Sequence, residues 1–142
     1  MKKLCPICNR PARNALATYC AAGCAKLVER ARFVDNPEER TQRVHAVKES
    51  WKGGAFRCHY SGVELEIFDS SSPFYFSFDH VTPRDGSKMV ACAAFINEIK
   101  SDSSEDEFRQ NTILLAKHFE NGTTLSRSHF KLKYYRRHRN NQ

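Results

Sequence analysis

The sequence contains no long hydrophobic run. A membrane-spanning helix needs roughly 18 or more consecutive apolar residues, and no stretch of the 142 residues comes near that length. Residues 1–6 also lack the apolar segment of a secretory signal peptide. We therefore expect a cytoplasmic protein that has no membrane partner.

Because an export signal is lacking, the six cysteines are not expected to form disulfides. Cytosolic thiols are kept reduced, so metal binding and simple burial are the alternatives, and the spacing of the cysteines separates them. The hydrophobic content of 40% and aromatic content of 11% are enough for a modest core. The length predicts one domain of ordinary size with appendages.

Acidic residues are absent from residues 121–142, which carry six basic ones. Residues 1–57 carry 12 basic and 5 acidic side chains, whereas residues 58–120 carry 5 and 11. The two basic ends indicate that the chain holds a polyanion, for which nucleic acid is the obvious candidate. The acidic middle suits a bound cation or acid–base chemistry.

Two pairs of cysteines lie near the N-terminus. Cys5-Pro6-Ile7-Cys8 forms a tight knuckle, and Cys20 and Cys24 open a helix expected over residues 25–33. Four thiolates suit a structural Zn²⁺ ion, and a segment this short needs such a staple to fold. The pattern resembles the FCS-type treble-clef fingers, so residues 1–34 are expected to form a four-cysteine zinc finger. Four free buried cysteines are the alternative.

A linker helix is expected within residues 35–55. Asn36 can cap its start, Pro37 suits the first helical position, and Val44, Val47 and Trp51 recur at helical spacing. The helix should end at the Gly53-Gly54 pair. Its basic side chains could contact phosphates or form a solvated face, and the sequence leaves both open: Arg40, Arg43, Lys48 and Lys52.

Residues 56–120 are expected to form the main core. Alternation of apolar and polar residues predicts strands over residues 63–68 and 74–78, a further strand over 89–92, and a short helix over 93–100. A second helix is expected to open at residues 103–107, with Phe108, Leu115 and Phe119 as its core stripe.

Three motifs in this core resemble the HNH endonuclease family. They are Cys58-His59-Tyr60-Ser61-Gly62, then Asp79-His80-Val81-Thr82-Pro83 for the DHxxP motif, and Asn97-Glu98-Ile99-Lys100-Ser101-Asp102 for the NxxKSD ending. The resemblance implies an α+β protein with a ββα-metal core, of the small type found in phages and mobile elements, including homing endonucleases.

The resemblance also implies a role for each motif residue. His80 would be the general base, Asp79 and Asn97 would bind a catalytic Mg²⁺ or Mn²⁺ ion, and Lys100 would contact a phosphate. Carboxylate and amide oxygens are the hard ligands that such ions prefer, and a histidine near its ordinary pKa can accept a proton at cellular pH.

The chain departs from the family pattern in places. Lys88 lies where the family has a middle asparagine, and Cys58 and Cys92 lack the second cysteines of a structural zinc site, so we expect both to be buried. Position 101 is a serine where some members have a histidine ligand. His118 would replace it only by folding back, and we assign it no such role.

The C-terminal extension, residues 121–142, interleaves basic and aromatic residues. This composition favours a nucleic-acid clamp, although a disordered solubilising tail or a ribosome-like RNA contact would share it. The expected nucleic-acid contacts of the extension are Arg127, Lys131, Lys133, Arg136 and Arg137.

Together these features predict a metal-dependent HNH endonuclease that cleaves DNA, either by nicking or by double-strand cleavage. Double-stranded DNA is the expected partner, and a phage-encoded protein would act in the cytoplasm of a bacterial host. RNA as the substrate, and a monomer or a homodimer, stay open. A non-catalytic zinc-finger protein with a degenerate HNH core is the main alternative. A third possibility is a zinc finger that binds an enzyme partner. This possibility leaves the pattern of Asp79, His80 and Asn97 unexplained.

Overall fold

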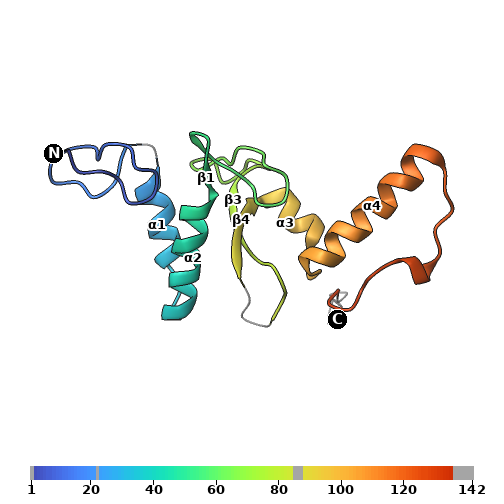
Figure 1. The fold of residues 1–142 in the computed structure, drawn as a ribbon. Helices are drawn as coiled ribbons and strands as arrows, with labels where there is room; N and C mark the ends of the chain where they lie inside the picture. The colour runs from blue at the N-terminus through green and yellow to red at the C-terminus, as the bar shows by residue number, and fades with distance from the viewer. Residues whose placement is uncertain (1, 22, 85–87, 136–142) are drawn as a thin grey trace. The chain divides into compact units, whose positions relative to one another are not determined.

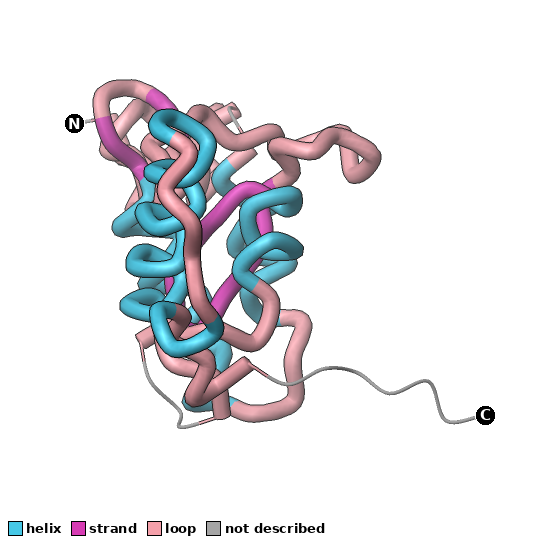
Figure 2. The backbone as a smooth tube through the Cα atoms, turned by 90° about the vertical axis from the view of Figure 1, so that its right-hand side faces the viewer, coloured by secondary structure: helices cyan, strands magenta, loops and turns pink. Residues whose placement is uncertain are grey.

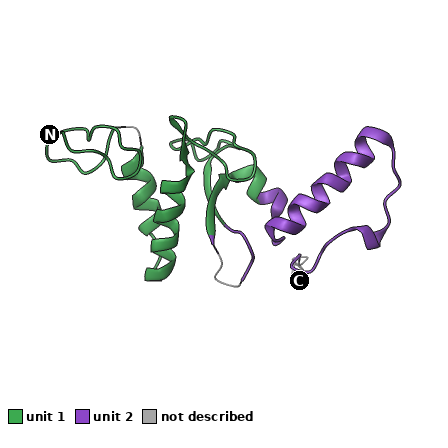
Figure 3. Ribbon diagram, in the orientation of Figure 1, with its two compact units in different colours: residues 1–79, 89–97 green, residues 80–88, 98–142 purple. Residues whose placement is uncertain are grey.

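The computed structural model describes residues 2–21, 23–84 and 88–135, which fold into an α+β structure with four α-helices and two small sheets (Figure 1). The expected α+β class is therefore confirmed. The chain divides into two compact units (Figure 3). The first comprises residues 1–79 and 89–97, and the second comprises residues 80–88 and 98–142.

Two helices of the first unit were expected from local signals. α1 spans Cys24–Arg32 and α2 spans Pro37–Ser50. The side-chain oxygen of Asn36 accepts hydrogen bonds from the amides of Glu38 (2.9 Å) and Glu39 (3.2 Å). These bonds satisfy donors that a helix start leaves without a partner. The predicted N-cap is thus confirmed.

The expectation that α2 ends at the glycine pair is wrong. The helix ends at Ser50, and Trp51–Lys52 form β1, which pairs antiparallel with β2, Ala55–Phe56. Gly53 and Gly54 both have positive φ, 60° and 84°, and form the two-residue turn of this hairpin. Such turns require left-handed conformations that glycine adopts without strain.

The expected strand over residues 63–68 is also not formed. This segment makes only isolated bridges, between Arg57 and Glu64 and between Glu66 and Tyr75, and the surrounding chain is loop (Figure 2). The carboxylate of Glu66 accepts hydrogen bonds from the amides of Phe68 (3.0 Å) and Asp69 (3.1 Å). These bonds turn the chain away from an extended path.

The second sheet consists of β3 (Phe76–His80) and β4 (Met89–Ala93), which form a hairpin. α3 (Ala94–Lys100) begins at the residue directly after β4, so the strand and the helix are joined without a loop. The predicted order of strand, turn, strand and helix is therefore confirmed.

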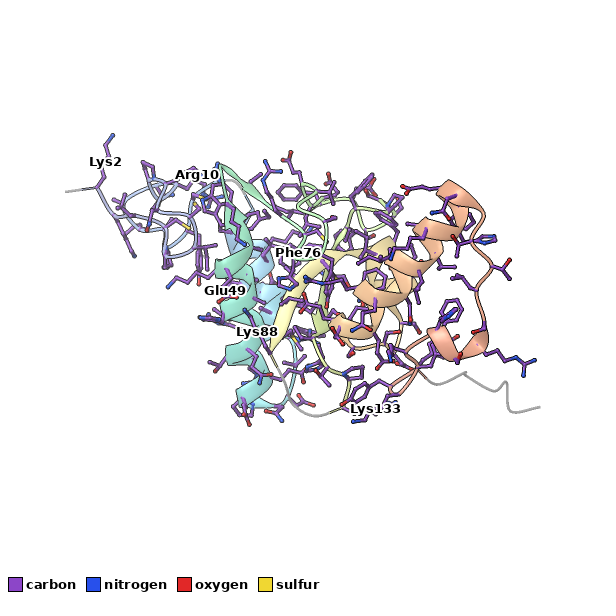
Figure 4. All side chains as sticks on the ribbon, turned by 45° about the vertical axis from the view of Figure 1, so that its right-hand side comes forward. Lys2, Arg10, Glu49, Phe76, Lys88 and Lys133 are labelled. Atoms are coloured by element: carbon purple, nitrogen blue, oxygen red, sulfur yellow. The ribbon has the colours of Figure 1, made fainter. Side chains whose placement is uncertain are left out.

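The core of the first unit is built around α2 and β4. α2 packs against both α1 and β4, and every residue of β4 is buried. Phe76 of β3 is fully buried (Figure 4), with its ring centroid 6.3 Å from that of Phe56 and 5.3 Å from that of Phe78. These aromatic contacts fix the position of β3 within the unit.

The main helix of the second unit, α4, spans Glu105–Asn121. The Ser104 hydroxyl accepts the amide proton of Glu107 at 3.1 Å, which confirms the expected helix start. Of the expected core stripe, Phe108 is half-buried, but Leu115 is 43% exposed and Phe119 is 79% exposed, so the three residues do not form a core. Apolar periodicity identifies a face of a helix, but burial also needs a surface that covers it.

The described part of the C-terminal extension folds back along α4. It contains a short 3-10 turn, η1 (Arg127–His129), and then pairs with the helix through side-chain hydrogen bonds. The side chain of Asn111 bonds both the carbonyl (2.8 Å) and the amide (2.9 Å) of Lys131. The buried carboxylate of Glu107 accepts the Tyr134 amide proton at 3.0 Å. Of the helices in the described ranges, none is long and apolar enough to cross a bilayer.

Candidate functional site

Four cysteine sulfurs of the first unit lie close together. The Sγ atoms of Cys5, Cys8, Cys20 and Cys24 all lie within 4.8 Å of one another, and all four residues are buried. Cys20 Sγ lies 3.5 Å from the Sγ atoms of both Cys8 and Cys24. Tetrahedral zinc, with Zn–S bonds of about 2.3 Å, places its sulfur ligands about 3.8 Å apart. The cluster therefore fits a zinc ion, as the spacing predicted.

Local structure brings the cysteines together. The amide of Cys5 bonds the carbonyl of Arg10 (2.8 Å), and Asn9, with φ of 58°, turns the chain between them. Cys24 is the first residue of α1, after Gly23 with φ of 94°. A Cβ on Gly23 would lie 3.1 Å from the ring of Phe68, so glycine is needed for both space and conformation.

Arg10 is a further residue of the cluster, and the spacing of the cysteines did not predict it. Its Nε donates a hydrogen bond to Cys8 Sγ at 3.3 Å, and its guanidinium lies 4.2 Å above the ring of Trp51 (Figure 4). Burial of the Cys8 thiol acts to raise its pKa, but the hydrogen bonds, chiefly those from Arg10, outweigh burial and lower the pKa to about 6. In contrast, burial raises the pKa of Cys24, and the neighbouring cysteines raise it further. The only sequence signal for Arg10 was its place directly after the knuckle.

Two of the expected catalytic-site residues, Asp79 and Asn97, belong to the first unit, and hydrogen bonds hold both in place. The amide nitrogen of Asn97 on α3 donates to the Ser77 hydroxyl (2.9 Å) and to the Phe78 carbonyl (3.4 Å) on β3. The nitrogen is thereby used for structure, and the amide oxygen is the atom that could bind a hard cation. Asp79 follows Phe78 in β3 and accepts a 2.6 Å hydrogen bond from the Tyr60 hydroxyl.

The segment Cys58 to Gly62 explains how Tyr60 reaches Asp79. The Gly62 amide bonds the Cys58 carbonyl (2.8 Å), and Gly62 has φ of 75°, so the segment forms a tight turn. The amide of His59 bonds the carbonyl of Ala91 on β4 at 2.8 Å. No role was predicted for Tyr60 from the sequence, although Tyr60 lies within the Cys58 to Gly62 motif.

His80 is the last residue of β3 and belongs to the second unit. Its Nδ1 is buried and has no hydrogen-bond partner among the described residues. A buried polar nitrogen without a partner is unfavourable in a folded protein, so such a nitrogen is a candidate for contact with a ligand or water.

The expected phosphate contact by Lys100 is wrong for this structure. Lys100 is fully buried, and its ammonium group donates to the carbonyls of His80 (3.2 Å) and Ser103 (2.5 Å). These bonds connect the end of β3 to the turn after α3. Lys100 therefore has a structural role, because a side chain without exposed surface cannot reach a phosphate in solution.

The loop between β3 and β4 is closed at its base without the family's middle asparagine. The Val81 amide bonds the Lys88 carbonyl at 2.9 Å. The Val81 carbonyl also accepts the amide proton of Glu105 at the start of α4 (2.8 Å), and the Arg84 guanidinium donates to the Tyr134 carbonyl (3.0 Å). Backbone and side-chain bonds within the second unit thus hold the described part of this loop.

Three of the expected contacts in the basic extension lie on the surface. Arg127, Lys131 and Lys133 are exposed, whereas Arg136 and Arg137 lie outside the described residues. Because Lys131 is held by Asn111, the described part of the extension is ordered against α4. This finding argues against a disordered tail over those residues.

The burial expected for the two remaining cysteines is confirmed. Cys58 and Cys92 are buried, with exposed fractions of 3% and 0%. His118 is exposed on α4, and its Nδ1 lies 2.7 Å from the Thr123 carbonyl, at the helix end.

Comparison of the chain with models of protein families, with curated proteins and with solved structures gave no match. The chain has a small α+β fold with a buried cluster of four cysteines that could hold a metal ion.

Proposed function

We propose that this protein is a metal-dependent endonuclease of the HNH type that hydrolyses DNA phosphodiester bonds. The observation that carries the proposal is the β3–β4–α3 arrangement, with Asp79-His80 at the end of the first strand and Asn97 bonded back to that strand. This is the order of elements that the resemblance to the family implies.

In this proposal Asp79 and Asn97 hold a Mg²⁺ or Mn²⁺ ion through their side-chain oxygens. Bound there, the ion would supply Lewis-acid stabilisation of charge on the phosphate oxygens. The Tyr60 hydroxyl fixes the Asp79 carboxylate, and Ser77 fixes the Asn97 amide, so both ligands are oriented before the substrate arrives.

His80 acts as the general base. It accepts a proton from a water molecule as the water oxygen attacks the phosphorus, and the bond from phosphorus to the leaving oxygen breaks. A base must have a ring nitrogen that is not committed to another group. His80 is half-buried, so it keeps the exposed surface that contact with a water molecule requires, and its Nδ1 atom has no partner within the described part of the chain.

Cleavage of supercoiled plasmid with Mg²⁺ or Mn²⁺ tests the proposal. His80→Ala is expected to lower the rate of cleavage at least ~100-fold, in line with the loss of a general base, and to leave DNA retention in a gel shift intact. His45→Ala is the matched control, because His45 is an exposed histidine on α2. Full cleavage by His80→Ala would contradict the assigned base.

A second candidate is a zinc-finger nucleic-acid-binding protein without catalysis. Lys88 at the usual asparagine position favours it, together with the exposed basic residues of the ordered extension. It predicts that the wild type shifts DNA in a gel and gives no relaxed or linear product with either metal.

A further inference from the structure

A pocket in the first unit gathers positive charge where α1 meets α2. Its volume is about 420 Å³, and it is lined by Lys26, Glu29, Arg30, Phe33 and Arg43. Three of these side chains are cationic and one is anionic. Arg43 also forms an ion pair with Glu39 at 3.1 Å, so the pocket and this partner together carry a net charge of +1. It involves neither the four cysteines nor the Asp79, His80 and Asn97 pattern.

The two arginines of the pocket have unused hydrogen-bond donors. Arg30 Nη1 and Arg43 Nε are buried and lack a partner among the residues that the structure describes. Other atoms of the same groups are engaged, since Arg30 Nη2 donates to the Phe76 carbonyl (2.8 Å) and Arg43 Nη2 to Glu39 (3.1 Å). Leaving a buried donor unsatisfied is unfavourable, and more so when the group is charged.

Aromatic rings hold both guanidinium groups in place. The guanidinium carbon of Arg30 lies 4.4 Å from the centre of the Tyr75 ring, and that of Arg43 lies 4.9 Å from the centre of the Phe78 ring. Cation–π contacts of this kind restrict the side chains. The two guanidinium groups are therefore held in a preformed arrangement.

The electrostatics of the pocket favour an anion. Burial lowers the pKa of Arg30, Tyr75 acts in the opposite direction, and the positive charge of Arg43 adds a smaller lowering effect. Two like charges close together repel each other, and an anion between them would remove the repulsion and also accept their unused N–H groups. Guanidinium groups bind phosphate in this way, through charge-assisted and often paired hydrogen bonds.

Phe33 indicates which kind of phosphate compound would fit. It lies at the C-terminal end of α1, lines the same pocket, and is 89% exposed. An aromatic ring beside phosphate-binding groups can stack on a nucleobase. In a duplex the bases stack on one another, so an accessible base belongs to a single strand.

We propose that this pocket binds a phosphate of single-stranded nucleic acid, with Arg30 and Arg43 on the phosphate and Phe33 stacked on an adjacent base. The inference rests on nucleic acid as the ligand of the proposed function, but it does not depend on cleavage. It adds a contact to one strand beyond those expected from the basic extension.

Fluorescence anisotropy with a labelled oligothymidine of about eight nucleotides tests the pocket, using the full zinc-loaded chain without Mg²⁺. Phe33→Ala is expected to weaken binding about 10-fold, the size of effect expected when one stacked base is lost. Arg43→Gln is also expected to weaken binding about 10-fold, in line with the loss of a charge-assisted hydrogen bond to a phosphate. Arg13→Gln is the control, since Arg13 is exposed in the same unit and does not line the pocket. Arg43→Gln should also reduce the salt dependence of binding by roughly 0.7 in log–log slope, the value for one phosphate on a single strand.

Phe33→Ala guards against a folding artefact, because the ring is exposed and its removal leaves the core intact. Titration with thymidine monophosphate and with inorganic phosphate then separates a nucleic acid from a free phosphate compound. Arg43-dependent binding of the oligonucleotide supports the proposal. Arg43-dependent binding of thymidine monophosphate alone, or variants that match Arg13→Gln throughout, would overturn it.

His80→Ala separates this inference from the proposed hydrolysis. In that variant the oligonucleotide should still bind and should still depend on Arg43 and Phe33. Arg43-dependent binding in a wild type that cleaves no plasmid would contradict hydrolysis alone, whereas cleavage with Arg43-independent binding would contradict the pocket alone.

Discussion

The side chain of Arg10 links the cysteine cluster to β1 of the same unit. Arg10 donates to Cys8 Sγ and lies over the ring of Trp51 in β1. Cation–π stacking holds the guanidinium, and the hydrogen bond stabilises the thiolate form of Cys8. Groups that bond to metal ligands in this way tune both the affinity and the pH range of metal binding.

Replacing Arg10 should therefore weaken zinc binding and shift its pH dependence. The pKa of Cys8 is lowered from 9.0 to about 6, so the stabilisation of its thiolate is complete above pH 9 and is lost as the pH falls through 6. Arg10→Ala should bind zinc about 10-fold more weakly and release it at a higher pH. Zinc release to a chromogenic chelator between about pH 5 and pH 8 would measure both effects, with exposed Arg13→Ala as the control. Identical release curves for Arg10→Ala and the wild type would refute the role of Arg10.

Lys100 offers a second test at the scale of one residue. Lys100→Met keeps most of the side-chain volume but removes the donors to the carbonyls of His80 and Ser103. Buried carbonyls without a donor should lower the free energy of unfolding by about 2 kcal/mol, as measured by urea denaturation. Lys117→Met, on the exposed face of α4, should change it little. If Lys100→Met instead has normal stability and a reduced salt dependence of DNA binding, Lys100 contacts a phosphate, as the sequence predicted.

Among the elements, those with a local signal could be predicted from the sequence. The knuckle, the Asn36 cap and the Ser104 cap each depend on hydrogen bonds within a few residues, so the sequence pattern was sufficient. The strand expected over residues 63–68 failed because a strand needs a partner along its length, which alternation does not supply. The stripe on α4 failed for a related reason, since periodicity does not say what covers it.

The pairing of the extension with α4 also makes a prediction. Asn111→Ala removes both hydrogen bonds to Lys131, so the extension should detach more often from the helix. Amide hydrogen exchange at residues 130–134 should become about 5- to 10-fold faster, as expected for the loss of roughly 1 kcal/mol. Gln110→Ala is a suitable control, because Gln110 bonds Asp106 within the helix. Equal exchange in both variants would show that Asn111 does not hold the extension.

At the scale of the whole molecule, distant parts of the sequence combine in ways that no local pattern reveals. Arg30 and Phe76 are 46 positions apart, yet their hydrogen bond joins α1 to β3 within the first unit. The pocket beside it requires the packing of α1 against α2. Sequence analysis left the role of Arg43 open because the relevant neighbours, Phe78 and Arg30, become visible only in the fold.

Removal of zinc should affect the whole first unit. The finger has little apolar surface of its own, so the cluster is expected to depend on metal. Because α1 begins at Cys24 and carries Arg30, chelation should reduce helical circular dichroism and weaken oligonucleotide binding together. Cys5→Ser should reproduce both losses, and excess Zn²⁺ should reverse them only in the wild type. A chelated protein with unchanged helicity and binding would show that the finger folds without metal.

The direct junction of β4 and α3 limits which changes in chain length the protein can accept. Ala93 ends the strand and Ala94 starts the helix, so no residue between them can absorb an insertion. One added residue would turn the helix by about 100° relative to the strand and carry Asn97 away from Ser77 and Phe78. We therefore expect length variation among natural or engineered variants to collect in the 81–88 loop, and the spacing from Met89 to Asn97 to stay constant.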